Sequence, residues 1–254
     1  MKSDFSGFPT EIRELLSSLD GERQKEALER IEGGEPPAYV FGRKFFFNNY
    51  FYINRDCLIP RPDTERAVEA VIENLPRGGS LADLCSGCGV IALSVLDIRR
   101  DALAFLCDIS ENALEAAKKN TENLGLSDRV SIKRSDILKE DPLEGEYDII
   151  VSNPPYLRTD EIGEYPDLAA EPIIAFDGGV DGLDFYRRIV RDLSAHLKKD
   201  GTLIFEIGYT EKPGIERIAR KQGFSCETRR DYGGNWRTAI LKRSNREEDT
   251  DEKT

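Results

Sequence analysis

The 254-residue sequence has little histidine, no long apolar run and no excess of positive charge. It contains one histidine and five scattered cysteines, so we expect no metal site of the zinc type. No apolar run is long enough to cross a membrane, and residues 1–4 do not open a signal peptide. We therefore expect a globular protein that neither spans nor binds a membrane.

The cysteines, Cys57, Cys85, Cys88, Cys107 and Cys226, form an odd and dispersed set. This pattern indicates reduced thiols and a cytoplasmic location. Cys85 and Cys88 match the C-x-x-C spacing of redox and metal sites, but the sequence has no second such pair. We interpret them as small residues that fill a tight loop, and a redox role stays open.

The formal net charge is −12, and part of it lies in residues 244–254, which have five acids, two bases and no apolar residue. Such a composition predicts a disordered acidic tail. The acidic balance argues against a broad duplex-binding surface, which would need a basic face. We expect no direct contact with nucleic acid, although a local basic patch stays open.

Two short regions are expected before the main domain. Residues 1–36 are predicted to be helical, with too little apolar surface to fold alone. Residues 37–57 are predicted to form a β-hairpin linker. Its turn is expected at Asn48 and Asn49, because asparagine tolerates the positive φ of tight hairpin turns.

Residues 58–243 are predicted to be one α/β domain, because strand and helix patterns alternate along them. We expect a doubly wound, mostly parallel, seven-stranded sheet of the Rossmann-like kind. The predicted strands are 81–84, 103–107, 130–133, 147–152, 202–207, 224–228 and 238–241. The predicted helices are 65–74 with Thr64 as its N-cap, 90–96, a helix from the Ser110 N-cap to Gly125, 183–197 and 211–222.

Three predicted strands end in residues that suit a nucleoside. The loop from Asp83 to Gly89 precedes a helix whose free N–H groups can bind an anion, but it lacks the G-x-G-x-x-G pattern. Asp108 is placed to accept hydrogen bonds from two ribose hydroxyls, and Asp136 to face an adenine amino group. Singly, Asp83 could only orient the loop, Asp108 only cap a helix and Asp136 only lie on the surface. Together they favour a nucleoside without pyrophosphate.

The stretch from Tyr147 to Tyr156 begins as a buried strand and ends in Asn153-Pro154-Pro155-Tyr156. The two prolines remove two backbone donors and fix two φ angles. An amide and an aromatic ring are therefore held at fixed offsets at the end of a strand, where open α/β sheets bind ligands.

These residues resemble the class I S-adenosylmethionine-dependent methyltransferases, and within them the release-factor glutamine methyltransferases of the HemK/PrmC type. The resemblance covers nearly all of residues 33–243. Its most specific part is Leu58-Ile59-Pro60-Arg61-Pro62-Asp63-Thr64-Glu65, and Asn153-Pro154-Pro155-Tyr156 is similar to the family's substrate motif. Further matches are Gly34-Glu35-Pro36, Tyr39, Gly42, Glu171-Pro172, residues 177–184, Glu206-Ile207-Gly208 and residues 230–235.

The resemblance implies S-adenosyl-L-methionine as cofactor and a peptide chain release factor as partner, methylated on the glutamine of its Gly-Gly-Gln loop. It implies Asn153, Pro154 and Tyr156 as catalytic residues, which with Pro155 also bind the substrate. The Asn153 side-chain oxygen and the Pro154 carbonyl would accept the two amide N–H groups, and Tyr156 would pack against the amide. The implied cofactor-binding residues are Asp83, Cys85, Ser86, Gly87, Cys88, Gly89, Asp108, Asp136, Ile137 and Asn153, with Arg61, Pro62 and Thr64 as candidate support of the cofactor loop.

The sequence departs from the family pattern at two places. Cys85 stands where the family has glycine, and we expect a modest effect provided that the position needs no positive φ. Only about 33 residues precede the linker, whereas the family carries a larger helical N-terminal domain that helps to hold the release factor. The motifs therefore imply the chemistry, and the identity of the partner protein stays open.

The sequence offers no histidine as a catalytic base, because His196 is predicted to lie on the surface, and the proton is expected to pass to water. Alternative acceptors are a glutamine of a ribosomal protein and the amino group of adenine in a nucleic acid. A non-catalytic scaffold is the alternative from another class of protein, and a monomer is expected.

Overall fold

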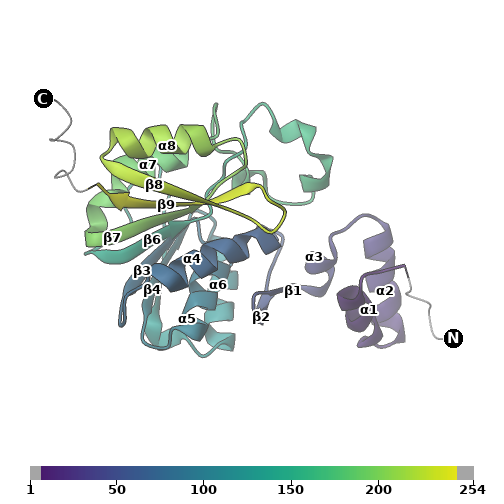
Figure 1. Ribbon diagram of the computed structural model, residues 1–254. Helices are drawn as coiled ribbons and strands as arrows, with labels where there is room; N and C mark the ends of the chain where they lie inside the picture. The colour runs from purple at the N-terminus through teal and green to yellow at the C-terminus, as the bar shows by residue number, and fades with distance from the viewer. Residues whose placement is uncertain (1–6, 245–254) are drawn as a thin grey trace, which may run out of the picture.

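The computed structural model describes residues 7–244 (Figure 1). The predicted acidic tail lies outside these residues, except for Ser244. None of the helices within the described range is long and apolar enough to cross a bilayer.

A seven-stranded sheet forms the centre of the described protein, in the order β5-β4-β3-β6-β7-β9-β8 (Figure 1). All neighbouring strands are parallel except β9, which runs antiparallel to β7 and β8. This arrangement confirms the predicted fold class. The strands are β3 (Ser80–Leu84), β4 (Leu103–Asp108), β5 (Val130–Arg134), β6 (Tyr147–Ser152), β7 (Leu197–Glu206), β8 (Phe224–Arg230) and β9 (Trp236–Arg243).

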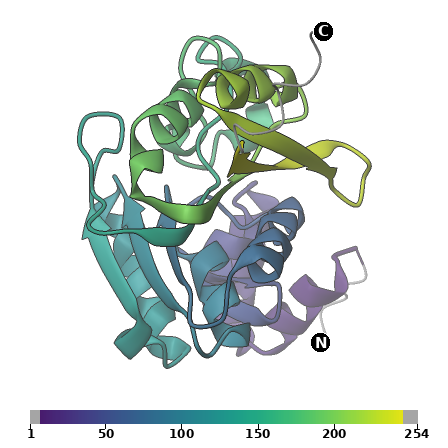
Figure 2. The same ribbon diagram turned by 60° about the vertical axis from the view of Figure 1, so that its left-hand side comes forward.

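Helices cover both faces of the sheet (Figures 1 and 2). Side chains of a strand alternate between faces, so Leu81 and Ile149 pack into one core and Ala82 and Ile150 into the other. The first core includes residues of α4 (Glu65–Asn74), α5 (Val90–Ile98) and α6 (Glu111–Asn123). The second includes residues of α7 (Asp184–Arg191) and α8 (Lys212–Lys221).

The strand order reverses between β3 and β6. The chain proceeds outward from β3 through β4 and β5, and then returns to place β6 on the other side of β3. Open α/β sheets bind ligands outside the carboxyl ends of the strands at such a point. Leu84 pairs with Ser152, so the loops that begin at Cys85 and Asn153 lie side by side.

The N-terminal part packs beside the main sheet (Figure 1). The Asn120 side chain of α6 accepts from the Tyr52 N–H at 2.7 Å and donates to the Tyr52 carbonyl at 2.9 Å, which fixes the small sheet on the main core. A short helix over 37–41 was not predicted; it begins where Pro37 supplies a suitable φ at the first helical position. The elements are α1 (Thr10–Ser17), α2 (Gly21–Glu32), α3 (Pro37–Phe41), β1 (Arg43–Phe46) and β2 (Asn49–Tyr52).

The hairpin turn lies at Phe47 and Asn48, one residue earlier than predicted, because Phe46 pairs with Asn49. Phe47 adopts φ +55°, packs against the main core, and donates its N–H to Glu65 at 3.2 Å. The Asn49 side chain instead donates to Asp97 at 3.0 Å. Contacts with the main domain thus outweigh the turn preference of asparagine.

One predicted helix cap and one predicted helix boundary are also wrong. The helix begins at Glu65, as predicted, but Thr64 before it lies in a 3-10 turn with helical φ and ψ, and its hydroxyl makes no cap hydrogen bond. The helix expected over 183–197 ends at Arg191, because Leu197 pairs with Tyr147 and begins β7. His196, in the 3-10 turn between them, is half-buried and lies 2.7 Å from the Gly145 carbonyl and 2.9 Å from Asp141 rather than free on the surface.

Candidate active site

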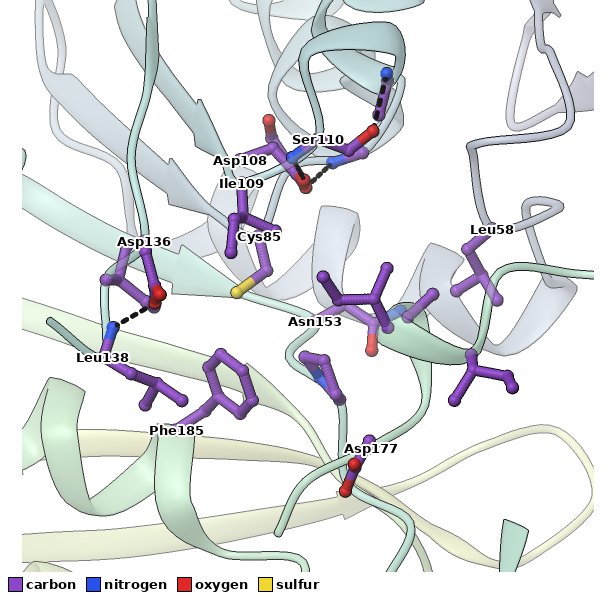
Figure 3. A pocket seen from close by; sticks show the side chains of 18 of the residues that line it. Leu58, Cys85, Asp108, Ile109, Ser110, Asp136, Leu138, Asn153, Asp177 and Phe185 are labelled. Atoms are coloured by element: carbon purple, nitrogen blue, oxygen red, sulfur yellow. Dashed lines mark hydrogen bonds between the residues drawn. The ribbon is translucent and has the colours of Figure 1, made fainter. Parts of the chain in front are cut away.

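Two cavities meet at the reversal point of the sheet. The first, of about 590 Å³, lies outside the ends of β3, β4 and β5, and the second, of about 290 Å³, lies outside β6 and β7. Leu58, Asn153 and Ala175 line both cavities. Figure 3 shows Asn153 facing the first cavity across from Cys85 and Asp108. Ligands in the two cavities would therefore meet at the Asn153 side chain.

The loop after β3 is built from left-handed backbone conformations. Cys85 has φ +59°, Gly87 +54° and Gly89 +85°. The expectation that Cys85 costs little depended on an ordinary φ, and the structure does not meet that condition. A residue with a Cβ is strained in this region by about 1–2 kcal/mol. The loop is held in this form by the Ser86 N–H, which donates to the Cys107 carbonyl at 3.0 Å.

Asp108, at the end of β4, closes the loop from the neighbouring strand. Its Oδ2 accepts from the Gly87 N–H at 2.8 Å and its Oδ1 from the Ser110 N–H at 2.9 Å. Burial raises the pKa of Asp108, and these N–H donors oppose the rise. Ser110, not Asp108, caps α6, since its hydroxyl accepts from the Ala113 N–H at 3.2 Å. Asp108 therefore fixes the loop and also faces the first cavity.

Asp83 and Gly89 shape the loop from behind and do not line the cavity. Asp83 is fully buried, and its Oδ2 accepts from the Ala92 N–H of α5 at 3.1 Å. Its Oδ1 has no hydrogen-bond partner within residues 7–244. Burial raises the pKa of Asp83 to about 7. A Cβ on Gly89 would lie 2.9 Å from Leu106 Cδ2, so the close approach of loop and strand requires glycine.

The remaining predicted cofactor residues surround the first cavity. Its lining includes Ser86, Gly87, Cys88, Asp136 and Ile137. Asp136 accepts from the Leu138 N–H at 3.1 Å and pairs with Lys139 at 2.7 Å, and Figure 3 shows it on the side of the cavity opposite Asn153.

The C-x-x-C cysteines belong to different cores. Cys88 is buried in a cluster with Cys57, whereas Cys85 packs against the core that includes Ala82 and Leu84. Burial raises the pKa of the Cys85 thiol well above its usual range. The structure therefore favours the interpretation of Cys85 and Cys88 as packing residues over a redox pair.

The four residues of the turn after β6 divide between the cavities. Asn153 lines both, Pro155 lines the first and Tyr156 the second. Pro154 is buried and lines neither, and no described backbone group donates to its carbonyl. Burial raises the pKa of Tyr156, so its hydroxyl stays protonated.

The three residues predicted to support the cofactor loop lie in different parts of the site. Thr64 lines the first cavity, Arg61 lines the second, and Pro62 lines neither. Arg61 forms an ion pair with the buried Glu171, whose other oxygen accepts from the Ile59 N–H at 2.8 Å. Arg61 thus ties the segment before α4 to the connection after β6 and is not part of the cofactor loop.

Sequence reasoning assigned no site role to several residues that line the cavities. Leu58, Ile109, Ala175 and Phe185 are apolar, and nothing in their type marks them as part of a site. Glu206, at the end of β7, lines the second cavity, and its place near the end of a predicted strand and in the Glu206-Ile207-Gly208 match could have indicated it.

Comparisons with known proteins agree with this geometry. Residues 62–171 match the family model described as "Methyltransferase small domain". A solved methyltransferase from Pyrococcus furiosus is similar in fold, with a TM-score of 0.55 and 18% identity over 87% of this chain and 97% of that one. The sheet therefore has the Rossmann-like fold of solved methyltransferases, and the family match covers its first strands and the turn after β6.

Curated relatives show which family of methyltransferases the chain resembles. A release factor glutamine methyltransferase of Clostridium acetobutylicum is 41% identical over 82% of this chain and 75% of its own length. One of Neisseria gonorrhoeae is 37% identical over 85% of this chain and 77% of its own. The chain belongs to the release factor glutamine methyltransferase family, which confirms the resemblance seen in its motifs.

Proposed function

We propose that this protein transfers a methyl group from S-adenosyl-L-methionine to the side-chain amide nitrogen of a glutamine in a peptide chain release factor, the glutamine of its Gly-Gly-Gln loop. The observation that carries the proposal is the meeting of two cavities at Asn153. One cavity suits a nucleoside, and the other is open to a side chain that arrives from a second protein.

The first cavity fits the cofactor by the chemistry of its walls. Asp108 and Asp136 supply acceptors for hydroxyl and amino groups, while Ile109 and Leu138 supply apolar surface for a flat base. The carboxylates also favour a cationic ligand. When bound, S-adenosyl-L-methionine supplies an electrophilic methyl group on a positively charged sulfur.

The turn after β6 positions the acceptor. An amide nitrogen is a poor nucleophile, so the protein's contribution is positioning and electrostatic stabilisation. The Asn153 side-chain oxygen and the Pro154 carbonyl accept the two amide N–H groups and stabilise the positive charge that develops on nitrogen. Tyr156, held in the wall of the second cavity, packs against the amide plane.

We also propose a division of labour along the chain. Residues 58–243 perform the chemistry, residues 37–57 link, and residues 1–36 contribute to the choice of protein substrate. The Lys44–Glu11 ion pair, at 3.0 Å, joins the first helix to the linker hairpin and supports a defined placement of that region.

Mass spectrometry of a methylated release factor tests the proposal. The full chain is incubated with S-adenosyl-L-methionine and purified release factor, and the peptides are then analysed. We expect one added methyl group on the glutamine of the Gly-Gly-Gln loop. A release factor with alanine at that glutamine is the control and stays unmodified. An unmodified release factor beside a methylated ribosomal protein or nucleic acid would overturn the proposal.

A further inference from the structure

The second cavity contains a carboxylate that the proposed roles of Asn153, Pro154 and Tyr156 do not use. Glu206 is the last residue of β7, is 3% exposed, and lines this cavity together with Asn153 and Tyr156. Its Oε2 is buried and has no hydrogen-bond partner within the described residues. A buried, unpaired carboxylate oxygen is costly, which points to a ligand that completes it.

The pairing of β6 with β7 places Glu206 beside Asn153, which lines both cavities. Ser152 of β6 is in parallel register with Phe205 of β7, so the next residues along the two strands, Asn153 and Glu206, are neighbours at the end of the sheet. A substrate amide bound by Asn153 would therefore lie next to the Glu206 side chain.

The cations near Glu206 are bound by other carboxylates. Arg237 pairs with Asp231 at 3.2 Å and with Asp63 at 3.3 Å. Arg61 pairs with Glu171. Glu206 therefore keeps the capacity to accept a proton or a hydrogen bond from a substrate.

The surroundings of Glu206 shift its protonation equilibrium toward the neutral form. Burial is the largest cause and raises its pKa to about 7, while Thr64, Arg237 and Arg61 oppose the rise. A carboxylate with a pKa near the working pH can both accept and release a proton. The titratable and charged groups that face Glu206 are Arg61 and Asp63 before α4, Tyr156 after β6, Tyr186 of α7, Glu211 before α8 and Arg237 of β9.

We infer that the Glu206 carboxylate takes up the proton that the amide nitrogen loses on methylation. This inference rests on the proposed function and replaces water as the expected acceptor. The nitrogen forms a bond to the methyl carbon while the carbon–sulfur bond of the donor breaks. The electron pair of that bond stays on sulfur, which becomes a neutral thioether. The extra proton on nitrogen passes to Glu206 and later to solvent.

Replacement of Glu206 in the full chain tests the inference, with purified release factor as substrate. Glu206→Gln keeps the size of the side chain but cannot take a proton, so we expect kcat to fall about 100-fold. S-adenosyl-L-methionine affinity, measured by calorimetry, should stay within about twofold and shows that the fold and first cavity are intact. Glu206→Asp keeps a carboxylate and should recover part of the lost rate. Glu216→Gln, an exchange on the outer part of α8, is the matched control and should behave as wild type.

The pH profile separates a proton acceptor from a structural carboxyl group. For the wild type, kcat/KM should rise with pH through about 7, the pKa of Glu206. Glu206→Gln should lose this limb, and Glu206→Asp should keep it. An unchanged rate in Glu206→Gln, or a surviving limb, overturns the inference alone. A wild-type protein that leaves the release factor unmethylated overturns the proposed function and this inference with it.

Discussion

The loop after β3 and the turn after β6 are neighbours that obtain their shapes in opposite ways. The first depends on positive φ angles at Cys85, Gly87 and Gly89 and on N–H groups bound to Asp108. The second has no positive φ among residues 153–156, because its two prolines fix the backbone without hydrogen bonds. In the β3 loop, backbone N–H groups already donate to other groups of the protein. In the β6 turn, the Asn153 side-chain amide and the Pro154 carbonyl stay available to bind a ligand. This difference suits a site in which one side holds a cofactor and the other orients a reacting group.

The largest effect is expected where the β6 turn loses its polar side chain. Asn153→Ala removes one acceptor of the substrate amide, which should raise the activation barrier by about 3 kcal/mol, by analogy with the loss of one oxyanion-hole donor. Rates under saturating cofactor and release factor provide the measurement. Cofactor affinity should change much less, and methylation at the wild-type rate would refute the role of Asn153.

A smaller effect is expected at the β3 loop, and on binding rather than on rate. Asp108→Ala releases the Gly87 and Ser110 N–H groups and should weaken cofactor binding by about 2 kcal/mol. Calorimetry measures this loss. Asp128→Ala, at an exposed position, serves as control. If Asp108→Ala lowers kcat and leaves cofactor affinity intact, the β3 loop does not act mainly in cofactor binding, and the proposed contrast with the β6 turn is wrong.

The pH dependence of stability tests the role of Asp83, the buried carboxyl group behind the β3 loop. The folded pKa of Asp83, about 7, lies above its unfolded value. Its contribution to stability is therefore complete below the unfolded pKa and is lost as the pH rises through about 7. Between pH 5 and pH 7 this loss should be about 2 kcal/mol in the free energy of unfolding. Asp83→Asn should reduce the slope in urea unfolding by this amount, while Glu206, whose pKa is also about 7, keeps its own contribution. Asp128→Asn should leave the slope unchanged, and an unaltered slope in Asp83→Asn would disprove the assignment.

The smallest effect is expected from the strained residue of the β3 loop. Cys85→Gly relieves the positive φ and should stabilise the fold by about 1 kcal/mol, after the entropy cost of glycine. Thermal unfolding is the measurement, and Cys85→Ala is the matched variant because it keeps a Cβ and therefore the strain. Equal stability of the glycine and alanine variants would show that the backbone strain is negligible.

The main sheet could be predicted because its central strands β3, β6 and β7 are largely buried on both faces and read as apolar runs between helix patterns. Asp83, Asp108 and Asn153 could be placed near one another from sequence, since each is at or beside the carboxyl end of a parallel strand. The hairpin turn could not be placed correctly, because contacts of Phe47 and Asn49 with the main domain decide its register. The positive φ of Cys85 was equally hidden, since that conformation comes from tertiary hydrogen bonds and not from residue type.

The second cavity was the least predictable part. Its polar residues are drawn from the segment before α4, the connection after β6, the end of β7 and β9, and only the fold brings these together. The contact of Arg61 with Glu171 spans a separation of 110 residues in sequence, beyond the reach of local patterns. The site roles of single residues remain predictions that the variants above address.

Leu58, Asn153 and Ala175 belong to the walls of both cavities, so a ligand in either cavity would contact residues that also line the other. Binding free energies obey reciprocity: if the protein substrate alters cofactor affinity by some factor, the cofactor alters substrate affinity by the same factor. A shared wall therefore couples the binding free energies of the two ligands, whichever of them binds first. A ligand in the second cavity can thus alter the affinity of the first cavity before any bond is broken.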